Sequence, residues 1–139
     1  MKQLPKIEKV MTPMPHTIGL KIKLSRAIEM MKENRFRHLP VQDEGRLVGV
    51  LTDRDIKLAS SFVHDGGDAE KLTVEDVMTP DPYTTTPEAP LDQVASEMAE
   101  HKYGCAIVQQ KNGKVVGIFT AVDALQVLAT VLRENYRHE

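Results

Sequence analysis

Val10-Met11-Thr12-Pro13 recurs 67 residues later as Val77-Met78-Thr79-Pro80, and this repetition decides how the chain of 139 residues is interpreted. Internal self-similarity at a fixed period is the mark of a duplicated structural unit. The same spacing relates four further pairs of apolar residues: Leu24 and Leu91, Ala27 and Val94, Met31 and Met98, Val41 and Val108. After one extra residue near Asn112 the spacing becomes 68, and it then relates Gly49 to Gly117, Thr52 to Thr120 and Asp55 to Asp123. The chain therefore contains two copies of one pattern, with a slip of the kind that loops tolerate.

Each copy predicts a strand, a helix, two strands and a second helix. In the first copy, apolar residues 24, 27, 28 and 31 have helical spacing, and residues 39–41 and 47–51 form apolar runs around a turn at 43–45. In the second copy, residues 91, 94, 95 and 98 form the helical stripe, and residues 106–108 and 115–119 flank Asn112-Gly113, a strong hairpin signal. We therefore expect an α+β fold in which small sheets are flanked by helices.

The duplication also predicts the domain organisation. Residues 7–62 form the first repeat and 74–132 the second. Residues 63–73 are expected to be an exposed linker, because Asp65-Gly66-Gly67-Asp68 interrupts any periodicity. Residues 133–139 form a polar C-terminal tail.

Composition limits the function classes. A net charge of -2 and a pI near 6.2 argue against a nucleic-acid binder, since such domains usually carry a marked basic excess. Cys105 is the only cysteine, so no intrachain disulfide can form, which fits a reducing compartment. We see neither a signal peptide nor an apolar run of membrane-spanning length. A cytoplasmic protein with no membrane partner is expected.

The order of motifs resembles CBS domains over about residues 7–132. The resemblance rests on two Met-Thr-Pro openings, the strand Arg37-His38-Leu39-Pro40-Val41 and two Gly-x-x-Thr-x-x-Asp endings in the same order. It implies two repeats packed about a pseudo-twofold axis, with two clefts between them, and a disc-like homodimer. It also implies that the clefts bind AMP, ADP, ATP, related dinucleotides or S-adenosylmethionine.

The Gly-x-x-Thr-x-x-Asp endings are the strongest candidate ligand contacts. Each ends a strand and opens a helix, where free backbone N–H groups and the helix dipole favour an anion. By resemblance, Thr52 and Thr120 are phosphate positions, and Asp55 and Asp123 accept hydrogen bonds from ribose hydroxyls. The same spacing also fits a capping box, in which both side chains only satisfy backbone donors. The sequence leaves both roles open.

Basic residues distinguish the two repeats. By resemblance, Arg37 or His38 reaches a ligand phosphate, and Arg54 adds a further cation beside Asp55; the alternative is a solvated basic cluster. Their counterparts in the second repeat carry no cation: Gly104, Cys105 and Val122. We expect the first repeat's residues to favour phosphorylated ligands.

The adenine contacts are expected near the first strand of each repeat, where the family holds the base through backbone and apolar groups. The candidates are Thr17, Ile18, Tyr83, Thr84 and Thr85. Neighbouring residues serve either as apolar walls or simply as core: Met11, Pro13, Met78 and Pro80.

The sequence offers no catalytic or metal-binding pattern, because the five histidines are scattered and no Cys-His or Ser-His-Asp grouping emerges. We expect no enzyme activity and no required cofactor. The leading hypothesis is a regulatory module that senses an adenine nucleotide and signals to a separate protein. The alternative is a scaffold for dimerisation and partner docking with vacant clefts.

The last helix carries an apolar stripe of Leu125, Leu128, Val131 and Leu132. Such a stripe either closes the core of the second repeat or forms a dimer contact, and periodicity alone does not separate the two roles.

Overall fold

The computed structural model describes residues 3–62 and 69–138. The chain divides into two compact units. One is Pro15–Pro82, and the other combines Met1–Met14 with Tyr83–Glu139. We call them the central unit and the terminal unit.

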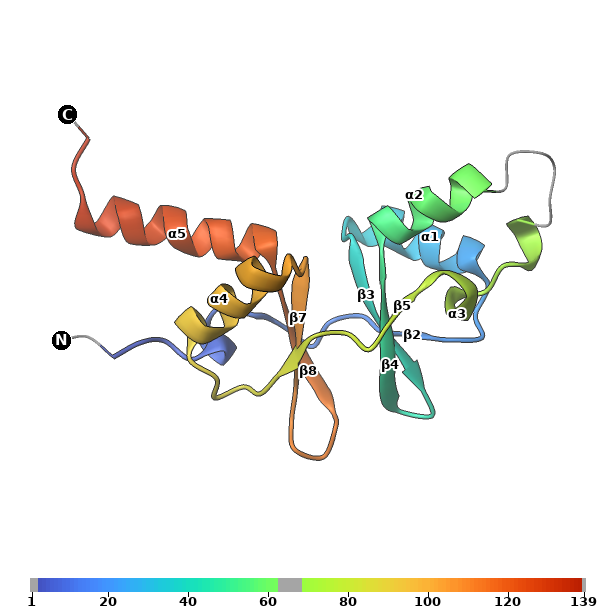
Figure 1. Ribbon diagram of the computed structural model, residues 1–139, viewed down its shortest axis with the longest axis horizontal. Coiled ribbons are helices and arrows are strands. Elements are labelled where there is room, and N and C mark those ends of the chain that lie inside the picture. Colours follow the sequence, from blue (N-terminus) through green and yellow to red (C-terminus); the bar gives the residue numbers. More distant parts are fainter. Residues whose placement is uncertain (1–2, 63–68, 139) are drawn as a thin grey trace. The chain divides into compact units, whose positions relative to one another are not determined.

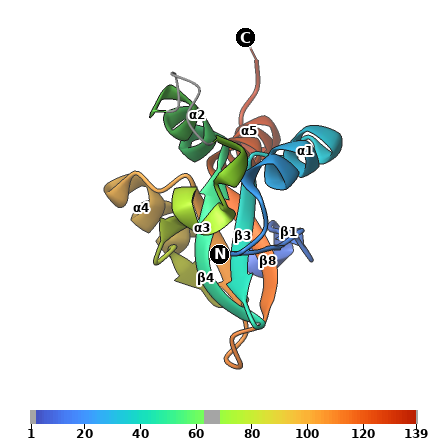
Figure 2. The same ribbon diagram turned by 90° about the vertical axis from the view of Figure 1, so that its right-hand side faces the viewer.

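The central unit is built on a four-stranded sheet in the order β2-β3-β4-β5. β2 runs parallel to β3, and the other pairs are antiparallel. Figures 1 and 2 show α1 and α2 at the end of the β3–β4 hairpin away from its turn. The elements are β2 (Ile18–Gly19), α1 (Leu24–Asn34), β3 (His38–Asp43), β4 (Arg46–Thr52), α2 (Asp53–Phe62), the 3-10 helix η2 (Ala69–Lys71), α3 (Val74–Val77) and β5 (Thr79–Pro80).

The terminal unit repeats this plan with a sheet in the order β1-β8-β7-β6. β6 runs parallel to β7, and β8 is antiparallel to both of its neighbours. The elements are the 3-10 helix η1 (Ile7–Lys9), β1 (Thr12–Pro13), β6 (Thr84–Thr85), α4 (Leu91–His101), β7 (Cys105–Gln109), β8 (Val115–Thr120) and α5 (Ala121–Asn135). The mixed α+β fold expected from the sequence is confirmed.

Each sheet gains its fourth strand from the Met-Thr-Pro segment that opens the other repeat. Thr79 pairs with Val50 in the central unit, and Thr12 pairs with Ile118 at the equivalent place in the terminal unit. The sequence did not predict this exchange. It explains why the compact units divide the chain differently from the sequence repeats.

The methionine of each Met-Thr-Pro segment packs against a glycine of the sheet. A Cβ added at Gly49 would lie 2.6 Å from Met78 Sδ and 2.8 Å from the Thr79 carbonyl oxygen. A Cβ at Gly117 would overlap Met11 Sδ. Gly49 is required because the backbone of the borrowed strand approaches it closely, whereas at Gly117 the close neighbour is the flexible Met11 side chain. Met11 and Met78 are thus partly buried core residues.

Both predicted hairpins are present. The β3–β4 turn uses Glu44 and Gly45, whose φ values of 49° and 78° are those of a primed two-residue turn. The β7–β8 loop is longer and has Gly113 at φ 87°, with the Asn112 side chain accepting from the Lys114 N–H at 2.9 Å. The longer loop accounts for the extra residue in the second repeat. Residues 63–68 of the expected linker lie outside the described residues.

The two cores confirm the predicted helical stripes. α1 buries Leu24, Ala27 and Met31 against the sheet of the central unit. α4 buries Leu91, Val94 and Met98 in the terminal unit. Within the described residues, no helix has the length and apolar character needed to span a membrane.

Candidate functional site

The junction between β4 and α2 holds Thr52 and Asp55 in a reciprocal arrangement. The Thr52 N–H donates to Asp55 Oδ2 at 3.0 Å, and the Asp55 N–H donates to Thr52 Oγ1 at 3.1 Å. This is a capping box at the start of a helix. Both residues are partly buried, so the box fixes their side chains at the edge of the unit.

The junction between β8 and α5 repeats the arrangement. The Thr120 N–H donates to Asp123 Oδ2 at 2.9 Å, and the Asp123 N–H donates to Thr120 Oγ1 at 3.2 Å. Capping is therefore a role that both pairs perform. Both side chains can still bind a ligand, because a carboxylate has about four acceptor sites and a threonine hydroxyl that accepts a hydrogen bond still has a proton to donate.

Each junction has fewer free backbone N–H groups for an anion than the sequence suggested, because the first one is already bonded. The N–H of Asp53 donates to the Arg37 carbonyl at 3.0 Å, and that of Ala121 donates to the Gly104 carbonyl at 3.0 Å. The second helical residue, Arg54 or Val122, keeps a backbone N–H that no carbonyl within its own helix can reach. A bound anion would therefore depend on side chains as well.

The predicted basic residues gather at the central junction. The Arg37 carbonyl is bonded to the first residue of α2, which holds the start of β3 beside the start of the helix. Arg37 and Arg54 are exposed, and His38 is half-buried as the first residue of β3.

The terminal junction lacks these charges. Gly104 and Val122 carry no ionisable side chain, and Cys105 is buried at the start of β7. Burial raises the pKa of the Cys105 thiol to about 11, so the thiol stays protonated and uncharged at neutral pH. The two junctions therefore differ in the charged residues beside them, and the expected difference in ligand preference stays a prediction.

The adenine candidates have unequal access to a ligand. Ile18 is 6% exposed and belongs to the central core, whereas Thr17 is half-buried. Thr84 and Thr85 are half-buried in β6 and pair with Ile107 and Val108. Ile18 therefore has mainly its backbone to offer a ligand.

Aromatic stacking at the first strands was not anticipated from the sequence. Tyr83 stacks on Tyr103 with ring centroids 5.0 Å apart, and His16 stacks on Phe36 at 5.2 Å. Burial, helped by the nearby charge of Glu97, raises the pKa of Tyr83. The repeat spacing of 67 relates the two pairs and would have revealed them.

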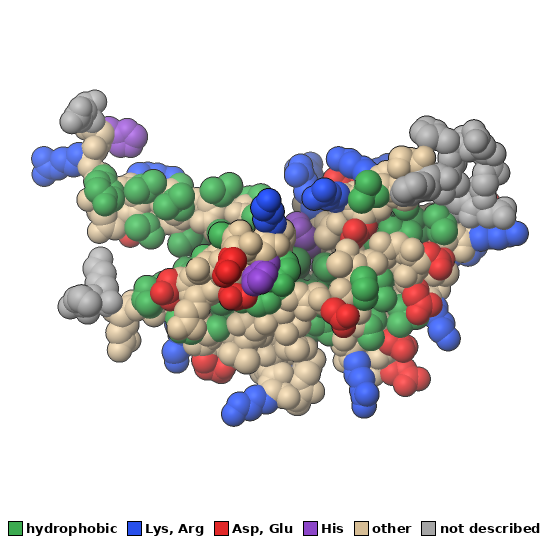
Figure 3. Space-filling view, viewed as in Figure 1, with side chains coloured by type: hydrophobic (Ala, Val, Ile, Leu, Met, Phe, Trp, Pro, Cys, Tyr) green, Lys and Arg blue, Asp and Glu red, His purple; other side chains and the backbone are tan. Residues whose placement is uncertain are grey.

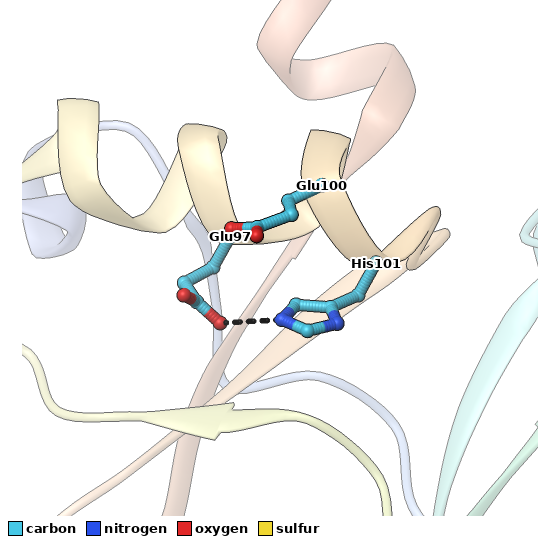
Figure 4. Close-up of side chains that lie close together, drawn as sticks. All are labelled: Glu97, Glu100 and His101. Carbon is cyan, nitrogen blue, oxygen red and sulfur yellow. Dashed lines mark ion pairs between the residues drawn. The ribbon is translucent and has the colours of Figure 1, made fainter.

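Three potential metal ligands lie on α4, where the sequence predicted none. Figure 4 shows Glu97, Glu100 and His101, whose ligand atoms lie within 4.8 Å of one another. His101 Nε2 is 3.3 Å from Glu97 Oε2, and the His101 ring stacks on Tyr103. All three are exposed, and such surface groups often cluster without a metal, so the cluster by itself does not indicate a metal site.

α5 leaves its predicted stripe on the surface. Leu125, Leu128 and Leu132 are 64%, 51% and 47% exposed, and Figure 3 shows hydrophobic side chains along this helix. Core contacts come instead from Ala124 and Val127. A shallow cavity of about 270 Å³ lies beside the helix, lined by Val10, Asp123, Gln126, Val127, Thr130 and Val131. The stripe therefore does not close the core of the terminal unit.

Comparisons with known proteins agree with this architecture. A CBS domain-containing protein of Dictyostelium discoideum is 32% identical over 134 residues, which cover 91% of this chain and 92% of that protein. The CBS domain pair of the protein MJ0100, solved in complex with 5′-methylthioadenosine and S-adenosyl-L-methionine, is 27% identical with a TM-score of 0.81 and covers 93% of this chain and 99% of that one. CBSX2, solved in complex with AMP, is 25% identical with a TM-score of 0.74 and covers 92% and 98%.

Other relatives are longer proteins with enzyme names, and the chain spans only 21% to 23% of their length. A CBS domain pair is a regulatory module and not a catalytic one, so those activities do not transfer with the match. The CBS domain family itself matches twice, at residues 7–61 and 74–130. This chain therefore belongs to the CBS domain family, as a tandem pair of CBS domains.

Proposed function

We propose that this chain is a regulatory module that binds an adenosine-containing ligand and signals its presence to a separate protein. The supporting observation is the strand-to-helix junction that occurs twice. In each junction the capping box holds a threonine hydroxyl and an aspartate side by side. The ligands of the MJ0100 pair and of CBSX2 share an adenosine group, which has ribose hydroxyls to donate to such an aspartate.

The aspartate and the threonine of each junction would contact different parts of the ligand. The capping oxygen of each aspartate is Oδ2. Oδ1 of Asp123 would accept from ribose, whereas Oδ1 of Asp55 also accepts from the Thr79 hydroxyl. Thr52 and Thr120 accept from the helix backbone and keep their hydroxyl protons for a phosphate oxygen. The adenine base would contact the first strands, through Thr17 and Ile18 in one unit and through residues 83–85 in the other.

Arg37, His38 and Arg54 give the central junction a preference for phosphorylated ligands such as AMP, ADP or ATP. Charge-assisted hydrogen bonds to phosphate are roughly twice as strong as neutral ones. The terminal junction has no cation at the equivalent positions, so it suits an uncharged adenosine group. The two kinds of ligand in the MJ0100 complex, 5′-methylthioadenosine and S-adenosyl-L-methionine, both lack phosphate.

Homodimerisation through α5 completes the proposal. Five large apolar side chains on this helix are about half exposed or more: Val122, Leu125, Leu128, Val131 and Leu132. A contiguous apolar face of this kind is typical of an association surface. The buried, unpaired Cys105 suits a reducing compartment such as the cytoplasm, where we expect the dimer to meet the protein that it regulates.

A dimerisation and docking scaffold with no ligand is the second candidate. The specific observation in its favour is that both Thr/Asp pairs already form capping boxes. On this view the motifs serve only the helix starts.

A thermal-shift screen separates the two candidates. We would test AMP, ADP, ATP, the nicotinamide dinucleotides, 5′-methylthioadenosine and S-adenosylmethionine at millimolar concentration. A ligand at a hundred times its dissociation constant stabilises by about 2.7 kcal/mol, which corresponds to a rise in Tm of about 5 to 10 °C. The double variant Asp55→Asn/Asp123→Asn is the control and should lose the shift. A flat screen for the unmodified chain would favour the scaffold.

A further inference from the structure

The two candidate ribose-binding aspartates have different surroundings. Asp55 accepts from the Thr52 N–H and also from the hydroxyl of Thr79, whose Oγ1 lies 3.1 Å from Oδ1 and 3.3 Å from Oδ2. Within residues 3–62 and 69–138, Asp123 accepts a side-chain hydrogen bond only from the Thr120 N–H. One hydroxyl therefore spans both oxygens of Asp55 and has no equivalent at Asp123.

Backbone pairing does not explain this difference. Thr79 lies opposite Val50 in β4, and Thr12 lies opposite Ile118 in β8 at the equivalent register. Thr12 is thus the positional counterpart of Thr79, and both residues are exposed. The difference lies in the side-chain hydrogen bond itself, which joins residues 24 positions apart in the central unit.

A ribose that binds Asp55 must compete with this bond. The Thr52 N–H and the Thr79 hydroxyl take up two of the about four acceptor sites of the carboxylate, and the Thr79 oxygen lies within 3.3 Å of both carboxylate oxygens, where two vicinal ribose hydroxyls would have to approach. Among the described residues no donor bonds to Oδ1 of Asp123, so a ribose there would displace none of them. The cost at Asp55 is that of one exchanged hydrogen bond, which corresponds to about a three- to tenfold change in affinity.

We propose that Thr79 is a specificity-determining residue that competes with ribose for Asp55. It thereby weakens binding at the central junction for ligands that are recognised only through their two ribose hydroxyls. This inference rests on the proposed function, because it concerns the same aspartates. The central junction then favours ligands that also bring a phosphate to its arginines. The terminal junction binds the uncharged nucleoside through the unobstructed Asp123.

Substitution of Thr79 by valine tests the proposal, since valine has the shape of threonine without the hydroxyl. Adenosine and 2′,3′-dideoxyadenosine are titrated by calorimetry into the unmodified chain and into Thr79→Val, Thr79→Ser and Thr12→Val. We expect Thr79→Val to tighten adenosine binding at one site by about three- to tenfold, with dideoxyadenosine unchanged. Thr79→Ser keeps the hydroxyl and should match the unmodified chain, as should Thr12→Val.

The possible failures are distinct. Adenosine binding that is unchanged or weaker in Thr79→Val overturns the competition while the proposed function stands. An equal gain for dideoxyadenosine also overturns it, because the effect would then not involve the diol. Absence of binding by both nucleosides and by AMP, in the unmodified chain and in Thr79→Val alike, overturns the proposed function together with this inference. Thr79→Ser guards against misfolding, since it must melt and bind like the unmodified chain for the comparison to hold.

Discussion

Replacement of Asp123 by asparagine and by alanine separates the two roles of this residue. Asparagine keeps one side-chain oxygen that can accept from the Thr120 N–H, now 2.9 Å from Oδ2, but it loses the charge and the second acceptor oxygen. Alanine loses this hydrogen bond, although the N–H of residue 123 can still donate to Thr120 Oγ1. The two variants therefore differ in stability, and both lack the carboxylate that we assign to ribose.

The magnitudes follow from the capping box. Loss of the hydrogen bond from the Thr120 N–H costs about 0.5 to 1.5 kcal/mol, so Asp123→Ala should lower the free energy of unfolding by this amount. Asp123→Asn should lose less than half of it, because the asparagine side-chain oxygen can still accept from the Thr120 N–H. Loss of hydrogen bonds to a charged acceptor costs about 1.5 to 3 kcal/mol, so both variants should bind adenosine about 10- to 100-fold more weakly.

The chain contains a matched control. Thr73 and Asp76 form a related capping pair at the start of α3, which follows no strand of either sheet: the Thr73 N–H and hydroxyl both donate to Asp76 Oδ2, at 2.8 and 3.0 Å. Asp76→Ala should lower stability in the same range and leave adenosine affinity unchanged. Urea unfolding and calorimetric titration measure the two quantities. Wild-type affinity in Asp123→Asn, or an equal loss of affinity in Asp76→Ala, would refute the ribose assignment.

Four further predictions concern other parts of the chain. Arg37→Ala should weaken AMP by about 10- to 100-fold in calorimetry and leave adenosine nearly unchanged, because only the phosphate needs the guanidinium; equal losses would point to a folding defect. Light scattering at micromolar concentration should give the mass of a dimer for the unmodified chain. Leu128→Glu should give the mass of a monomer, because dimerisation would bury its charge in an aliphatic contact. A monomeric unmodified chain would contradict the proposed dimer. Gly49→Ala should lower the free energy of unfolding by about 1 to 3 kcal/mol, because the new Cβ meets the Thr79 carbonyl and forces β5 to move. Unchanged stability of this variant in urea unfolding would argue against the close approach of β5. Burial raises the pKa of Cys105 from 9.0 to about 11, so its contribution to stability is fully present below pH 9 and is lost as the pH rises from 9 to 11, about 3 kcal/mol in total. Cys105→Ala should flatten this part of the pH dependence in urea unfolding, and an unchanged slope would show that other groups cause it.

Local sequence patterns predicted the helices, the hairpins and the family. Helical spacing identified the buried faces of α1 and α4, since one face of a helix must meet the core every three or four residues. Asn112-Gly113 and Asp43-Glu44-Gly45 identified the turns, because their glycines tolerate a positive φ. The Thr-x-x-Asp spacing predicted both the capping box and a ligand site, and the structure contains the box twice. The ligand role stays a prediction.

Only the tertiary structure decided which segments far apart in the chain meet. β1 and β5 are two residues long, so they carry no periodicity from which a pairing partner could be read, yet each completes the sheet that the other repeat supplies. The hydrogen bond between Thr79 and Asp55 joins two separate motifs, and nothing in the sequence of either motif indicates that they meet. The helical spacing of the apolar stripe on α5 was compatible with both a core role and a dimer contact. The structure placed Ala124 and Val127 against the core and left Leu125 and Leu128 exposed, because a helix can turn only one face to a small sheet and packing selects which face that is.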